Sequence, residues 1–293
     1  MCDAVVLSFS NFSEETCSRV GAELIRLSKN NSFTLNPLAY FESSDLESAA
    51  RYIMAMAGLT TQGREDVEHV THAIKLTKAL HGSTASLTGL QAYCQDHDNA
   101  VLRDLALGLE PFTEHGDYGS LFTTSKSLLP LAGLSVIDFS DIRIGDRLEC
   151  LLMILVLKIS SLPNINAHAQ RVVIVEDLLM LWAGLDDVSA LCVPILDQII
   201  TRGNDDDFGL WSRQIKISDF EQNVAGSKLI QSADTFVYLT NSIDTKNDQA
   251  AHDNVPAAEL RVMVSGLNSS KQGRIEMVTQ RAGGQPELVK LRV

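Results

Sequence analysis

The chain has 293 residues, 45% of them hydrophobic, so it is long enough to bury a sizeable core. It carries 37 acidic against 24 basic residues, a net charge of −13 at pH 7. This balance argues against a dominant nucleic-acid surface, because phosphate contacts need clustered lysine and arginine. The five cysteines form no CxxC pair, which indicates reduced thiols in a cytosolic protein.

Residues 1–44 predict the first part of an α/β core. A short apolar strand at residues 4–7 is followed by a helix with acids in its first turn. This helix begins near Ser13 and ends at Gly21, and residues 24–27 then alternate like a second strand.

Residues 45–125 predict a helical insertion. Val67, Val70 and Ile74 recur at intervals of three and four residues, which is the period of an amphipathic helix. Pro111 closes the last helical pattern of this segment.

Residues 126–293 predict the remainder of the core. Residues 134–139 (LSVIDF) and 171–175 (RVVIV) are continuous apolar runs, typical of strands in a parallel sheet covered on both faces. Residues 146–161 are apolar almost all round, which predicts a buried helix. The longest apolar run in this segment, residues 150–157, is too short to cross a membrane, which takes about 20 residues.

Further strand candidates follow towards the end of the chain. Residues 208–211 and 235–239 are strand candidates, and we expect residues 134–140, 171–175 and 235–239 to be neighbouring strands of one mainly parallel sheet. Two short strand patterns around residues 283–286 (GGQP) predict a C-terminal β-hairpin. The sequence therefore predicts an α/β fold with a mainly parallel sheet, a helical insertion and a short terminal hairpin.

The strand at 171–175 ends in two acids, Glu176 and Asp177, which is a Walker-B-like pattern. A buried parallel strand delivers carboxylates to the carboxyl edge of its sheet, where open α/β sheets bind ligands. There, one acid can hold a magnesium ion and the other can polarise an attacking water. The alternative is that the two acids cap the next helix, as acids at this position commonly do.

The partner motif of a Walker-B strand is missing. A phosphate-binding loop reads GxxxxGK[ST], because glycine amides surround the β-phosphate and the lysine neutralises it. The chain contains no Gly-Lys dipeptide. We therefore expect that this chain alone does not hydrolyse ATP.

The order of these segments resembles the C-terminal RecA-like domain of the TraC family, which belongs with the VirB-type traffic ATPases of type IV secretion and conjugation. The similar stretches are spread along the chain, at residues 8–28, 32–41, 100–122, 134–142, 171–182 and 216–239. The resemblance implies a RecA-like fold and ATP-driven pilus assembly or substrate transfer, by an oligomer at the inner face of a bacterial membrane.

The resemblance also implies roles for four residues. Glu176 stands where the family has its metal-binding Walker B aspartate, and Asp177 stands where the family has its catalytic glutamate. Arg202 falls near a family arginine that reaches a neighbour's nucleotide, and Gln214 is the candidate sensor glutamine.

The sequence departs from the family at its beginning, which lacks the first core strand, the phosphate loop and its helix. We expect that strand to lie beside the strand at 171–175, so that its loss either leaves unpaired backbone groups there or forces the sheet to close around the gap. Three hypotheses follow: a P-loop-deficient relative or fragment of a traffic ATPase, half of a split ATPase completed by a chain with a phosphate loop, or a non-catalytic interaction domain.

Alone the chain is expected to need no cofactor; completed by a partner, it would use ATP and Mg²⁺. The expected partners are other type IV secretion components or further copies of the chain, without direct nucleic-acid binding, in the cytoplasm or peripherally at the inner membrane.

Overall fold

The computed structural model describes most of the chain up to residue 176 and shorter stretches beyond it. The described residues are 2–8, 13–28, 32–59, 63–131, 133–142, 146–162, 170–176, 188, 193–197, 208–213, 231–233, 235–239, 274–281 and 287–292. By its internal contacts the chain divides into two compact units, Met1–Arg213 and Gln214–Val293.

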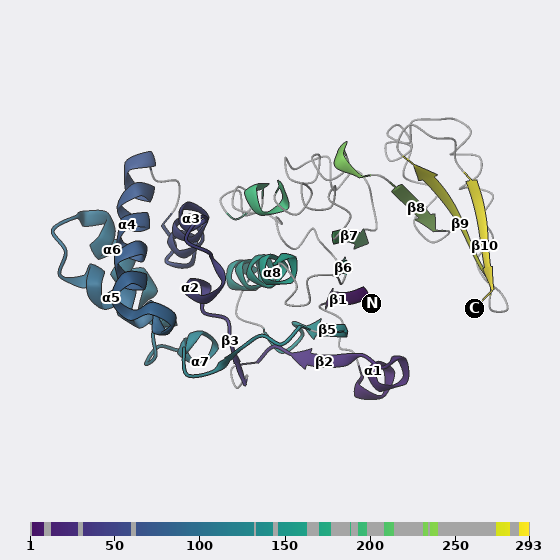
Figure 1. Ribbon diagram of the computed structural model, residues 1–293, viewed down its shortest axis with the longest axis horizontal. Helices are drawn as coiled ribbons and strands as arrows, with labels where there is room; N and C mark the ends of the chain where they lie inside the picture. Colours follow the sequence, from purple (N-terminus) through teal and green to yellow (C-terminus); the bar gives the residue numbers. More distant parts are fainter. Residues whose placement is uncertain are drawn as a thin grey trace. The chain divides into compact units, whose positions relative to one another are not determined.

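The centre of the first unit is a five-stranded sheet in the order β2-β5-β1-β6-β7 (Figure 1). Every neighbouring pair in this sheet is parallel. The strands are β1 (Cys2–Ser8), β2 (Glu23–Arg26), β5 (Leu134–Asp138), β6 (Gln170–Glu176) and β7 (Phe208–Arg213). The predicted α/β class with a mainly parallel sheet is confirmed.

The strand order differs from the expected one in one respect. The strands of residues 134–138 and 170–176 are not neighbours, because β1 lies between them and pairs with both. Beside the Walker-B-like strand the sheet is closed, which is one of the two outcomes expected there, because β6 is paired with β1 on one side and β7 on the other. Since β1 is apolar and bonded on both sides, it takes the buried interior position where such a strand is most stable.

Two helices of this unit confirm their sequence patterns. Helix α1 (Glu14–Val20) begins at Ser13, whose hydroxyl accepts a hydrogen bond from the Thr16 amide at 3.1 Å, and it ends at Gly21 with φ 70°. Helix α8 (Asp146–Ser161) has the predicted bounds, and its side chains are buried from residue 150 onwards. It contacts both β1 and β6, and its other side contacts α2 (Pro37–Tyr40) and α3 (Leu46–Met56) (Figure 1).

Most of the described residues between 46 and 122 are helical, as the sequence predicts for most of the insertion. The remaining elements are α4 (Arg64–His81), η1 (Gly82–Thr84), α5 (Leu87–Gln95), α6 (Ala100–Leu109), η2 (Glu110–Phe112) and α7 (Gly119–Phe122). A two-stranded parallel ribbon, β3 (Phe33–Thr34) with β4 (Ser127–Leu128), flanks this segment in the sequence. In the part of the chain that the structure describes, no helix is long and apolar enough to cross a membrane.

Gly108 permits one close helix contact in this segment. A β-carbon at this position would lie 2.2 Å from the carbonyl oxygen of Ala57, at the end of α3. Only glycine fits there without moving a backbone, so the approach of α6 to the end of α3 depends on this residue.

The second unit contains a three-stranded antiparallel sheet in the order β10-β9-β8. Strands β9 (Arg274–Arg281) and β10 (Glu287–Arg292) form the predicted C-terminal hairpin. Strand β8 (Thr235–Leu239) pairs antiparallel with β9, so its expected membership of the parallel sheet is wrong. A five-residue apolar strand carries no information about which distant strand it will pair with, and here β9 offers a matching antiparallel register.

Candidate functional site

The carboxyl ends of the five parallel strands meet at one edge of the sheet, which is where open α/β sheets bind their ligands. The polar residues that end these strands are Ser8, Arg26, Asp138, Glu176 and Arg213. We call these five residues the carboxyl-edge row.

The strand register places the row at one level across the sheet. Asp138 of β5 is in register with Arg26 of β2 on one side and with Ser8 of β1 on the other. Glu176 of β6 is in register with Arg213 of β7, and it follows directly after the residue that pairs with Leu7. Glu176 therefore lies level with Ser8, so that acids alternate with basic or hydroxyl residues along the edge.

Asp138 is fully buried, with no exposed surface. Its Oδ1 accepts a hydrogen bond from the Ser140 amide at 2.8 Å. Among the described residues none donates a hydrogen bond to its Oδ2, which lies 3.9 Å from Nε of Arg26. Buried polar groups are normally hydrogen-bonded, so the contacts of this carboxyl group with Ser140 and Arg26 matter for the strand end.

Arg26 connects this buried carboxylate to the helix after β1. Its Nη1 lies 3.4 Å from the Glu14 carboxylate in the first turn of α1. The guanidinium thus faces one acid on β5 and one on α1, with its side chain 39% exposed. The backbone ties the same strand ends together, because the Phe139 amide donates to the Ser8 carbonyl at 2.9 Å.

Of the four residues that the sequence singled out, the structure places only Glu176, at the end of β6 in the carboxyl-edge row. Asp177, Arg202 and Gln214 lie outside the described residues. Their roles, and a magnesium-binding role for Glu176, stay predictions.

The described residues do not fit the phosphates of a nucleotide. A phosphate cradle needs glycine amides and a lysine where a parallel strand passes into a helix. Strand β1 ends at Ser8 and helix α1 starts after Ser13, and the intervening sequence, FSNF, contains neither glycine nor lysine. Acids at two of the other strand ends, Asp138 and Glu176, would repel a phosphate further.

Sequence reasoning identified the strand at 134–139 but gave no role to Asp138. The signal was available, because LSVID has the same form as VVIVE, an apolar run closed by an acid. That both runs end at one level of one sheet follows only from their register with β1.

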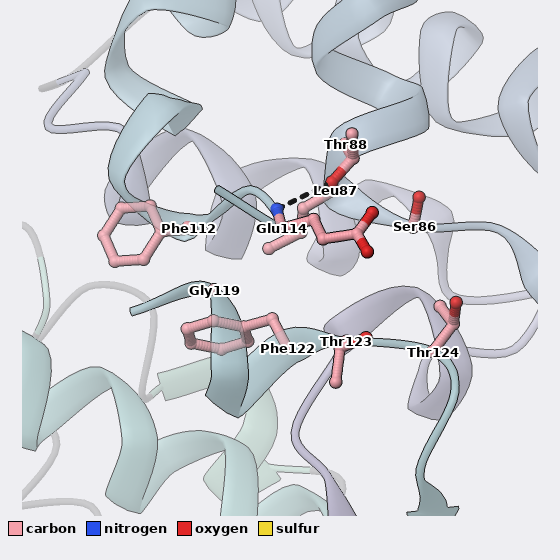
Figure 2. Close-up of a pocket in the computed structure, with 9 residues that line it drawn as sticks. All are labelled: Ser86, Leu87, Thr88, Phe112, Glu114, Gly119, Phe122, Thr123 and Thr124. Carbon is pink, nitrogen blue, oxygen red and sulfur yellow. Dashed lines mark hydrogen bonds between the residues drawn. The ribbon is translucent and has the colours of Figure 1, made fainter. Parts of the chain in front are cut away.

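A separate small pocket lies in the helical segment, between the start of α5 and the residues around α7 (Figure 2). The Glu114 amide donates to the Thr88 hydroxyl at 2.9 Å across its wall. Phe112 and Phe122 are in edge-to-face contact, with ring centres 5.7 Å apart. The lining residues are Ser86, Leu87, Thr88, Phe112, Glu114, Gly119, Phe122, Thr123 and Thr124, and they contain no pairing of nucleophile and base. The pocket therefore offers no catalytic set.

Comparison with solved structures identifies a similar fold over the whole chain. The structure of VirB4 from Thermoanaerobacter pseudethanolicus superimposes with a TM-score of 0.75, covering 100% of this chain and 82% of that one, at 13% sequence identity. This chain has the VirB4 fold. At such low identity the likeness establishes the fold and leaves the activity to be argued separately.

Two structures of the bacterial conjugative coupling protein TrwB also match, at 12% identity, covering 99% of this chain and 77% of theirs. Their TM-scores are 0.46 for the unbound form and 0.47 for the complex with an ATP analogue, so the fold assignment rests on VirB4. No curated protein matches the sequence. The profile of the MMPL family matches residues 20–109, which is less than half of the chain and does not establish membership.

Proposed function

We propose that this chain is a P-loop-deficient relative or fragment of a type IV secretion traffic ATPase that acts in pilus assembly or in DNA or protein transfer. The observation that carries the proposal is the VirB4 fold, which extends over the whole chain and agrees with the TraC-like order of its sequence segments. In this proposal the chain works in the cytoplasm or peripherally at the inner membrane, with other type IV secretion components as partners.

The chain by itself is proposed to be inactive towards ATP. It lacks the glycine amides and the lysine that hold the β- and γ-phosphates. The acids Asp138 and Glu176 at the carboxyl edge cannot replace them, because they carry the same sign of charge as the phosphates. The dissociation constant for Mg-ATP should therefore be about millimolar or weaker. This corresponds to a binding free energy of at most about 4 kcal/mol in magnitude.

Isothermal titration of the purified 293-residue chain with Mg-ATP tests this proposal. We expect no saturation below about millimolar nucleotide. A micromolar dissociation constant would contradict it, and Glu176→Gln with Asp177→Asn would then show whether the predicted acids take part. Magnesium alone serves as the control for cation binding without nucleotide.

The second candidate is half of a split ATPase, in which a partner chain supplies the phosphate loop. In that case ATP and Mg²⁺ bind at the site formed by both chains. The residues of this chain that act there are Glu176, Asp177, Arg202 and Gln214. The level arrangement of Glu176 with the other strand ends favours this candidate, because a ligand at that edge would meet several strands at once. ATP hydrolysis that appears only on mixing with a chain containing GxxxxGK[ST], and that is lost in Glu176→Gln, would support it. If no such mixture hydrolyses ATP, the remaining candidate is a non-catalytic interaction domain.

A further inference from the structure

The small pocket at the start of α5 (Figure 2) combines polar and apolar walls, and Glu114 is the one charged residue among the described residues that line it. Its cavity of about 40 Å³ has room for only a few water-sized groups. Leu87 and Phe122 supply apolar surface and are themselves buried. Besides the Glu114 carboxylate, the polar walls carry the hydroxyl groups of Ser86, Thr88, Thr123 and Thr124.

The backbone around Glu114 is held in place by the residues next to it. Its amide donates to the Thr88 hydroxyl at 2.9 Å, which ties this loop to the first turn of α5. The Thr113 hydroxyl donates to the Glu110 carbonyl at 2.8 Å. Gly119 packs so closely on Thr113 that a β-carbon there would collide with the Thr113 carbonyl oxygen. A wall built in this way is largely formed before a ligand arrives, which lowers the entropic cost of binding.

The Glu114 carboxylate has no cationic partner in the part of the chain that the structure describes. None of these residues forms an ion pair or a hydrogen bond with its oxygens. Figure 2 shows the carboxylate extending into the pocket, between the walls formed by Ser86 and by Thr123. Lys126, a little further along the chain, donates to the Ser120 carbonyl instead. The pocket therefore presents a negative charge and several oxygen acceptors to a ligand.

We propose that this pocket binds the primary ammonium group of an alkylamine. An ammonium group has three N–H donors and no acceptor, which matches one carboxylate surrounded by hydroxyl oxygens. Its bond to Glu114 is charge-assisted, and such bonds are about twice as strong as neutral ones. The methylene groups next to the nitrogen contact the apolar surface of Leu87 and Phe122. The amine is either a free small molecule or the side chain of a lysine in another protein.

Other small ligands match these walls less well. Calcium takes six or more oxygen ligands, usually with several carboxylates, and the described walls offer one carboxylate. An anion would be attracted by the first amides of α5, but it would meet the negative charge of Glu114 in the same small space. A guanidinium group is a planar fork with five donors, which needs a wider cavity and more acceptors than a compact ammonium group does.

Nuclear magnetic resonance of the full chain with isotope-labelled threonine methyl groups tests the proposal. The probe is n-butylamine at neutral pH, and n-butanol is the neutral control of the same length. We expect n-butylamine to shift the methyl signals of Thr88, Thr123 and Thr124 in a saturable way, with a dissociation constant of the order of millimolar. The absence of saturable shifts, or equal shifts with n-butanol, would overturn the proposal.

Two glutamate variants separate the pocket from the general negative charge of the chain. Glu114→Gln keeps the size of the side chain and removes the charge, so it should raise the dissociation constant for n-butylamine at least about tenfold. The matched control is Glu110→Gln, which removes the same charge from the same loop at an exposed residue that does not line the pocket. It should leave the constant nearly unchanged, because solvent and salt screen this charge. Equal effects of the two variants would overturn the proposal.

A lysine derivative with both backbone ends blocked distinguishes the two sources of the amine. If it binds more tightly than n-butylamine, the natural ligand is a lysine side chain of another protein; if it binds no more tightly, the ligand is a free alkylamine. The same derivative acetylated on its side-chain nitrogen has no ammonium group and should not bind, and binding of this form would contradict the proposal. None of these outcomes bears on ATP affinity, so they test the pocket independently of the proposed function.

Discussion

The ammonium group of Lys158 lies 2.8 Å from the carboxylate of Asp45 and 5.8 Å from the centre of the Phe41 ring. This pair joins α8, the buried helix against the parallel sheet, to the residue that precedes α3, the first long helix of the helical segment. The side chains are only 10% and 16% exposed, so the ion pair is largely shielded from water.

Removing one member of this pair should be costly. Lys158→Met leaves the Asp45 carboxylate largely buried without its ammonium partner, and we expect a loss of about 3 kcal/mol in the free energy of unfolding. The double variant Lys158→Met with Asp45→Asn should recover part of that loss. Urea unfolding followed by circular dichroism measures the free energy of unfolding of both variants.

The control is Arg64→Ala, which breaks an exposed pair with Glu68 and should cost less than about 0.5 kcal/mol. Equal effects at the two sites would show that the buried pair has no special role.

Two buried tyrosine hydroxyls should differ in importance. The Tyr40 hydroxyl donates to the Thr34 carbonyl at 2.7 Å and accepts from the Leu129 amide at 2.9 Å. The Tyr52 hydroxyl donates to the Leu151 carbonyl at 2.8 Å, which lies within helix α8 and has a helical partner as well. Tyr40→Phe should therefore cost about 1–3 kcal/mol of unfolding free energy, and Tyr52→Phe about 1 kcal/mol or less. The reverse order in thermal or urea unfolding would contradict this reading of the two sites.

Gly108 and Gly89 provide a matched pair of helical glycines. Gly108→Ala would bring a β-carbon to 2.2 Å from the Ala57 carbonyl oxygen, so α6 must move and the chain should lose about 1–3 kcal/mol. Gly89→Ala meets its nearest atom, the Ser86 hydroxyl oxygen, at 3.4 Å, and should stabilise α5 by up to about 1 kcal/mol because alanine has the higher helix propensity. Unfolding curves that shift in the same direction for both variants would show that α6 does not approach α3 this closely.

Stability should fall in alkaline solution, in part because of Cys94. Burial raises the pKa of this thiol from 9.0 to about 11, so in the folded chain it keeps its proton to a higher pH than in the unfolded chain. Between these two pKa values the unfolded state loses the proton first and is favoured as pH rises. Burial also raises the pKa of Tyr40, to about 12, which acts in the same direction at higher pH.

Melting temperatures at pH 8 and pH 10.5 measure this effect. We expect a drop that is smaller in Cys94→Ala, a variant that removes the thiol but keeps an apolar side chain. At pH 8 the buried thiol should also react slowly with a disulfide reagent until the chain is unfolded. A pH dependence unchanged by Cys94→Ala would mean that the thiol ionises as readily folded as unfolded.

The sequence by itself determined the elements with strong local patterns. Helix α8 has the predicted bounds because residues 146–161 are apolar almost all round, and such a helix is stable only when buried. Strands β5 and β6 are parallel and interior, as their continuous apolar runs predicted, and the hairpin of β9 and β10 follows from the turn residues between them. In the candidate site, only the place of Glu176 at a strand end was foreseen.

The tertiary structure decided which strands are neighbours and which polar residues meet. The position of β1 between β5 and β6, and the pairing of β8 with β9, join segments that lie tens to more than a hundred residues apart in the chain. Strand pairing between such distant segments depends on the register and burial of the whole sheet, which no local pattern of side chains encodes. For the same reason, the buried carboxylate of Asp138 beside Arg26 and Ser8 became visible only when three separate strands ended at one level.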